Sequence, residues 1–194
     1  MAAGVILAAA ARPETGKNML NRIKTVIKHL WLDTSDARRV IPVDMLKRLA
    51  GRIKASEAHH IGEIRMDIEA SMPLSYLWRL GQLNTMKTLI RQRAVMQFSK
   101  LRVWDTAHNS GVLIYLQLAE RAIEIVADRG VAAHVTDAQW QAMVERMQLN
   151  FQQGHFEDGL TQALEEVSAL LVMHFPAGAK DGDRNELPDE PTLN

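Results

Sequence analysis

Residues 109–130 read NSGVLIYLQLAERAIEIVADRG, and this stretch decides the fold. Its alternating apolar residues predict a β-hairpin with a tip at Ala119 and Glu120. Pairing outward from that tip makes one face wholly apolar, through the pairs Val112–Ala127, Ile114–Ile125 and Leu116–Ile123. The first strand, residues 111–118, is apolar on both sides, which predicts a central position in a buried sheet.

The segments around the hairpin predict helices and one further strand. Helical spacing of apolar residues marks 18–32, 43–58, 84–101, a helix opened by Thr136 and ended by Gly154, and 155–175. Residues 62–70 alternate apolar and charged side chains, which is the pattern of a half-buried strand near an edge. The helical region 84–101 supplies the crossover that parallel strands need.

This element order predicts an α/β protein. We expect a single three-layer α/β/α domain with a small mixed β-sheet that contains the central hairpin, plus an extra N-terminal amphipathic helix. The expected organisation is a flexible leader at 1–17, the amphipathic helix at 18–32, the α/β domain at 33–175, and a disordered tail at 176–194 that has little apolar surface to bury.

Charge is unevenly distributed along the chain. Residues 1–102 carry 18 Lys and Arg against 8 Asp and Glu, whereas residues 103–194 carry 5 against 15. One interpretation is that early basic residues pair with late acidic ones within the fold. The other is a basic surface that docks on acidic lipid headgroups or on an acidic protein partner, with candidates Arg38, Arg39, Lys47, Arg48, Arg52 and Lys54. Nucleic acid is disfavoured because no aromatic residues interleave with the basic ones.

The N-terminal residues 1–11 are apolar but lack a preceding positive charge, so they make a poor signal peptide. Their apolar run is also too short to span a bilayer. We therefore expect a cytoplasmic protein, peripheral at the membrane if the basic surface docks there. Export stays open because Ala9–Ala11 resemble a cleavage site.

Polar residues gather near the open end of the predicted hairpin. Asp105, Asn109, Asp128 and Asp137 would supply the oxygen ligands that Ca²⁺ or Mg²⁺ prefers, so they form the predicted metal site. Each also has a simpler structural role. Asp137 suits the first turn of a helix, Asn109 suits a left-handed turn, and Asp128 suits a strand-end cap.

Several short motifs resemble a known family. They lie at residues 109–114, 121–125, 135–138 and 154–159, and together they resemble the TPM domain family, also called the TPM phosphatase domain, over about residues 31–175. The resemblance implies a single α/β/α domain, Ca²⁺ or another divalent ion in some members, and acid phosphatase activity in the plant branch. The sequence departs from the family at residues 128–130, where a glycine-rich turn is common.

The candidate metal site, the basic surface and the family resemblance together lead to two functional hypotheses. The first is a TPM-type domain that binds a divalent cation and acts as a module for a protein partner at the membrane surface. The alternative is a metal-dependent acid phosphatase. The chain has no cysteine, no glycine-rich phosphate loop and no His-Glu-x-x-His pair, so hydrolysis would need a metal ion to activate water.

Overall fold

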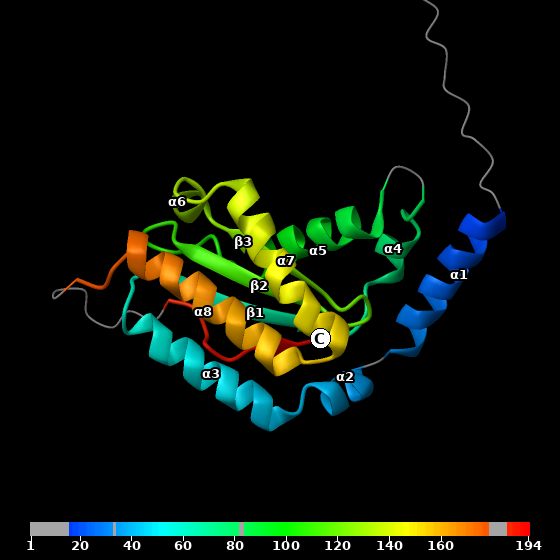
Figure 1. Cartoon of the computed structure of the whole chain (residues 1–194), viewed down its shortest axis with the longest axis horizontal. Helices are drawn as coiled ribbons and strands as arrows, with labels where there is room; N and C mark the ends of the chain where they lie inside the picture. The colour runs from blue at the N-terminus through cyan, green and yellow to red at the C-terminus, as the bar shows by residue number, and fades with distance from the viewer. Residues whose placement is uncertain (1–15, 33, 82–83, 179–185) are drawn as a thin grey trace, which may run out of the picture.

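The computed structural model describes residues 16–32, 34–81, 84–178 and 186–194. Within them lies a mixed sheet with the strand order β3-β2-β1-β4 (Figure 1). The strands are β1 (Glu63–Glu69), β2 (Gly111–Gln117), β3 (Ala122–Ala127) and β4 (Thr192–Leu193). Strand β1 is parallel to both β2 and β4, whereas β2 and β3 form the antiparallel hairpin.

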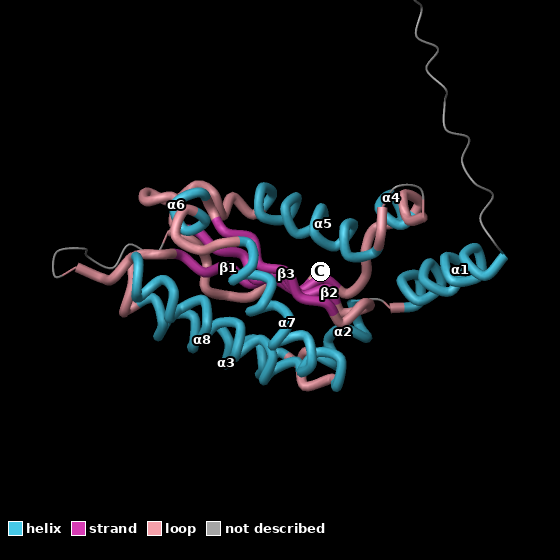
Figure 2. The backbone as a smooth tube through the Cα atoms, turned by 45° about the horizontal axis from the view of Figure 1, so that its top comes forward, coloured by secondary structure: helices cyan, strands magenta, loops and turns pink. Residues whose placement is uncertain are grey.

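Helices cover both faces of this sheet. The helices of the described residues are α1 (Gly16–Trp31), α2 (Thr34–Val40), α3 (Val43–Glu57), α4 (Leu74–Leu77), α5 (Met86–Lys100), α6 (Arg129–Ala132), α7 (Asp137–Gln153) and α8 (Phe156–His174). Figure 2 shows α3, α7 and α8 on one side of the strands and α5 on the other. The predicted three-layer α/β/α fold is confirmed.

The hairpin has the predicted register. Val112 lies opposite Ala127 and Ile114 opposite Ile125, with the turn centred between Ala119 and Glu120. The face with these pairs packs with α3, α7 and α8 in one apolar cluster. The opposite face packs in a second cluster with α5. A central strand that is apolar on both sides is what this double burial requires.

The ends of α7 are also as predicted. Thr136 and Gln139 form a reciprocal capping box, in which the Gln139 amide donates to Thr136 Oγ1 (3.3 Å) and the Thr136 amide donates to Gln139 Oε1 (2.8 Å). At the other end Gly154 has φ 84°, which is the left-handed conformation that glycine adopts most easily.

The predicted disordered tail is wrong for its last nine residues. Residues 186–194 return to the sheet and lie along β1, where they contribute β4. As a result β1 is an inner strand, and its charged side chains, expected to face solvent, are buried: Glu63, Arg65, Asp67 and Glu69. Residues 179–185 and the leader 1–15 lie outside the described residues. The first helix begins at Gly16, two residues before its predicted start.

Candidate functional site

The hairpin brings two of the four predicted metal ligands together. The Asp128 amide donates to the Gly111 carbonyl (2.8 Å), and the Gly130 amide donates to the Asn109 carbonyl (3.0 Å). Asn109 has φ 52°, the left-handed turn conformation expected for it. Its Oδ1 accepts a hydrogen bond from Arg129 Nε (2.9 Å), so a cationic side chain covers this oxygen.

Asp128 is the N-cap of α6. Its Oδ1 accepts from the Arg129 amide (2.7 Å), which satisfies a donor at the start of that helix. The residue is only 9% exposed, and its other oxygen, Oδ2, has no hydrogen-bond partner. A buried carboxylate oxygen without a donor is costly, so Oδ2 keeps its capacity to accept a hydrogen bond or to bind a cation.

The other two predicted ligands do not join Asp128. Asp105 pairs with Arg102 (3.3 Å) and is exposed. Asp137 lies in the first turn of α7, where it lines a cavity of about 510 Å³ beside β3 together with Lys87 and Arg91. In the part of the chain that the structure describes, no group of three or more His, Asp or Glu side chains is placed to hold a metal ion.

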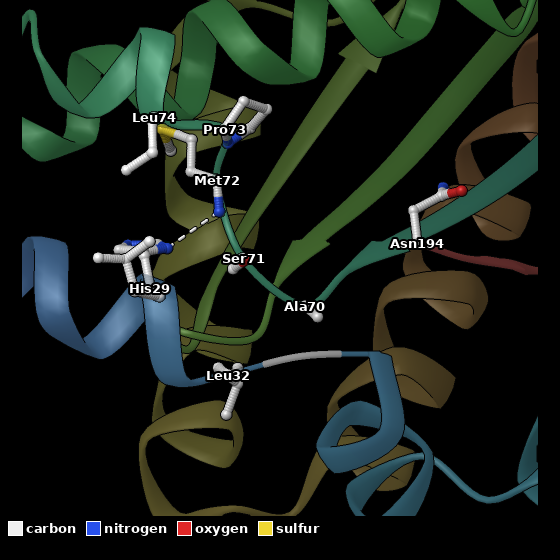
Figure 3. Close-up of a pocket in the computed structure, with 9 residues that line it drawn as sticks. His29, Leu32, Ala70, Ser71, Met72, Pro73, Leu74 and Asn194 are labelled. Atoms are coloured by element: carbon white, nitrogen blue, oxygen red, sulfur yellow. Dashed lines mark hydrogen bonds between the residues drawn. The ribbon is translucent and has the colours of Figure 1, made fainter.

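A groove lies at the opposite end of the sheet. The predicted ligands are at the amino ends of the parallel strands β1 and β2, whereas open α/β sheets usually bind ligands at the carboxyl ends. There, a groove of about 420 Å³ separates the end of α1 from the segment after β1 (Figure 3). It is lined by His29, Leu30, Leu32, Ala70, Ser71, Met72, Pro73, Leu74 and Asn194.

His29 fastens α1 to the rest of the protein. The residue is buried, its Nδ1 accepts from the Met72 amide (2.9 Å, dashed in Figure 3), and its Nε2 lies 3.0 Å from Glu120 Oε1. Because Nδ1 is the acceptor, the ring proton belongs on Nε2, which donates to Glu120. Burial alone would raise the pKa of Glu120, but His29 and the ammonium of Lys28 lower it. The sequence alone does not point to His29, because its two partners are 43 and 91 residues away in the chain.

The apolar side of α1 faces away from the body. Five large apolar residues share this side, because successive members are one, three or four positions apart in the helix. Their exposed fractions are 60% for Leu20, 45% for Ile23, 48% for Ile27, 59% for Leu30 and 80% for Trp31. We call this set the α1 apolar stripe. The helix sequence carries four Lys or Arg and no Asp or Glu. None of the described helices is long and apolar enough to cross a membrane.

Some early cations do pair with late acids. Arg48 of α3 makes a two-pronged contact with Glu157 of α8, through Nε (2.8 Å) and Nη2 (2.7 Å). Lys28 lies 3.3 Å from Glu120, and this pair also joins the two halves of the chain. Pairing within the fold therefore accounts for part of the charge asymmetry. Of the six basic residues considered for docking, Arg48 is engaged in this way.

Glu57 carries a carboxyl group that favours its protonated form. Burial, together with the nearby carboxylates of Glu63 and Asp189, raises the pKa of Glu57 to about 8, although the Ile64 amide donates to it (3.2 Å). A carboxyl whose pKa is raised on folding stabilises the protein at low pH. That contribution is lost as the pH rises from its ordinary value of 4.5 through about 8.

We therefore expect Glu57→Gln to stabilise the protein at high pH. The free energy of unfolding at pH about 9 should rise by about 1 kcal/mol, and the gain should vanish near pH 4, because glutamine never ionises. Urea unfolding of both proteins across this pH range measures the difference. A constant difference at all pH values would show that Glu57 is not the titrating group.

Comparisons with known proteins agree with this architecture. The TPM domain family matches residues 35–170. The NMR structure of the BA42 protein from the psychrophilic bacterium Bizionia argentinensis is similar, with 27% identity, a TM-score of 0.61, and coverage of 78% of this chain and 93% of that one. An N-terminal domain from P. gingivalis is 15% identical with a TM-score of 0.49, covering 72% and 83% of the two chains. No curated protein matches the sequence. The family match covers most of the α/β domain, and the chain belongs to the TPM domain family.

Proposed function

We propose that this TPM domain is a binding module that docks on an anionic membrane surface through α1 and meets a protein partner there. The observation that carries the proposal is the α1 apolar stripe on a helix that has cations and no acids. A helix of this kind lies in the interface, with its apolar side among the acyl chains and its cations near the headgroups.

The way α1 is attached supports this function. Figure 1 shows α1 extending from one end of the molecule, and His29 holds its last turn to the residues after β1. The α1 apolar stripe is turned outward, so the helix can enter the headgroup region without unfolding the domain. Trp31 ends the stripe, and tryptophan favours the boundary between headgroups and acyl chains.

Substitutions in the stripe test the proposal. We expect the double change Ile23→Ser and Ile27→Ser to lower partitioning of the full chain onto vesicles containing phosphatidylglycerol by about tenfold or more, because each isoleucine buries apolar surface in the bilayer. Co-sedimentation of protein with vesicles measures the partition coefficient.

The matched control is Leu149→Ser. Leu149 is exposed to a similar degree (61%) but lies on α7, outside the stripe, so its loss should leave partitioning unchanged. Equal losses in the two variants would show that general surface hydrophobicity causes the binding. Such a result would contradict a specific role for α1.

A second function, divalent-cation binding with metal-dependent phosphatase activity, is favoured by Asp128 Oδ2. This oxygen is buried and unpartnered, and Asn109 is joined to the same loop. The fit is partial, because two side-chain oxygens fall short of the roughly six to eight that Ca²⁺ takes. Arg129 also places its positive charge on Asn109 Oδ1. If a cation binds, Asp128 is the residue that would hold it.

This second function predicts opposite effects of two substitutions. Arg129→Gln should raise the affinity for Ca²⁺ or Mg²⁺ about three- to tenfold by removing a repelling charge, and Asp128→Asn should abolish binding. Calorimetric titration of the full chain measures both. If neither the unchanged protein nor the Arg129→Gln variant takes up an ion at millimolar concentration, Asp128 is a helix cap only. A phosphatase would further require phosphate release that needs the ion and Asp128.

A further inference from the structure

The polar face of β1 holds residues 186–194, called here the terminal segment, through a series of side-chain contacts. The first comes from Glu63, whose two oxygens accept hydrogen bonds from the consecutive amides of Glu186 (3.1 Å) and Leu187 (3.3 Å). One carboxylate thus binds the backbone at the start of the segment. Leu187 is buried in the cluster beneath α5, and it is the segment's main apolar anchor.

The second contact comes from Arg65, two residues along the same face of β1. Its Nη1 donates to the carbonyl of Glu190 (2.9 Å) and also to the carbonyl of Pro188. Backbone carbonyls are present in any peptide, so this arginine recognises an extended chain without regard to its side chains.

The third contact, made by Asp67, involves side chains of the segment and not its backbone. Asp67 Oδ1 accepts from the Thr192 hydroxyl and from Asn194 Nδ2 (2.8 Å). The backbone completes the pairing, since the Asn194 amide donates to the Ile68 carbonyl (2.9 Å) and the Ala70 amide donates to the Asn194 carbonyl (2.7 Å). Strand addition of this type combines backbone affinity with side-chain specificity.

The segment is poorly matched in charge to the face that holds it. Its acids Glu186 and Asp189 lie near Glu63, and Asp189 also lies near Glu57, whereas Glu190 lies near the cation of Arg65. Burial raises the pKa of both Glu63 and Asp67, and the segment's carboxylates raise that of Glu63 further. Like charges this close weaken the docked state, so an occupant that is neutral at the positions of Glu186 and Asp189 would fit better.

We propose that the polar face of β1 is a strand-addition site for an extended peptide that is neutral where this chain has Glu186 and Asp189, and that the terminal segment is its built-in competitor. The site would accept such a segment from a protein partner. Because the competitor is attached to the same chain, it acts at an effective concentration near millimolar, and the partner must displace it. This inference does not depend on docking by α1.

Peptide binding to the full chain tests the site. The probes are a fluorescent peptide with the sequence of residues 186–194 and a second, neutralised peptide with Glu186→Gln and Asp189→Asn, and their binding is measured by fluorescence anisotropy. We expect the neutralised peptide to bind about tenfold more tightly than the acidic one. Adding Thr192→Val and Asn194→Ala to the neutralised peptide should abolish its binding, because these changes remove both donors to Asp67.

A variant of the full chain tests the same contacts by weakening the attached segment instead of the added peptide. Thr192→Val with Asn194→Ala in the protein weakens the attached competitor, so the neutralised peptide should bind this variant more tightly than the unchanged protein. The unchanged protein alone already decides the question, whether or not the variant folds. Failure of the neutralised peptide to bind it at millimolar concentration would overturn the proposal, as would binding that is indifferent to the acids or to the two donors.

Discussion

Replacing Gly111 with alanine is expected to cost about 4 kcal/mol or more in the free energy of unfolding. Gly111 begins β2, and a Cβ atom built there would lie 1.9 Å from the carbonyl oxygen of Val103. The obstacle is backbone, so no side chain can rotate away. Val103 is fully buried and its amide donates to the Phe98 carbonyl (3.1 Å), so the loop cannot retreat without opening the core beneath α5.

Gly51 provides the matched control. It lies within α3, where an added Cβ would meet no atom within 4 Å. Alanine at this position should stabilise the protein by about 0.5 to 1 kcal/mol, since it restricts the unfolded chain and favours the helix. Urea unfolding midpoints of the two variants should therefore move in opposite directions. A Gly111→Ala protein with an unchanged midpoint would contradict the close approach of β2 to Val103.

Arg93→Met is expected to destabilise the fold by about 3 to 5 kcal/mol. Arg93 of α5 binds Glu69 at the end of β1 through Nε, at 3.1 Å and 2.9 Å from its two oxygens, and also through Nη2. The side chains of Arg93 and Glu69 are only 11% and 5% exposed. The buried Tyr115 hydroxyl donates to the same carboxylate (2.5 Å). Without the arginine, Glu69 would keep a buried charge with one neutral donor.

Arg48→Met tests whether burial is the cause. Arg48 has the same two-pronged geometry with Glu157, but its side chain is 52% exposed, so its loss should cost less than about 1 kcal/mol. If urea unfolding shows that the two variants lose the same free energy of unfolding, burial does not make the Arg93–Glu69 pair more stabilising than the exposed one.

The hairpin was predictable because its information is local. The period-two pattern on both sides of Ala119 and Glu120 permits one register with an apolar face, and a shift by one residue would expose that face. The capping box of α7 is likewise contained in four residues. The adjacency of Asn109 and Asp128 followed from the same register.

Other features depend on partners far away in the sequence. The terminal segment has few apolar residues, and its hydrogen bonds join it to Glu63, Arg65 and Asp67, more than 120 positions away in the sequence. No local sequence pattern predicts such contacts. The coverage of Asn109 by Arg129 depends on a rotamer, which periodicity does not determine. An amphipathic pattern marks α1 as a helix, but it does not tell whether its apolar side meets a core or faces outward.

Partitioning of the full chain between buffer and vesicles tests the central claim most directly. The comparison is between vesicles of phosphatidylcholine alone and vesicles that also contain phosphatidylglycerol, at low and high salt. Docking through α1 predicts binding that increases with the anionic lipid, weakens as salt screens the helix cations, and disappears in the Ile23→Ser, Ile27→Ser protein. A chain that stays in the buffer with both kinds of vesicle would contradict membrane docking and leave the α1 apolar stripe as a surface for a protein partner.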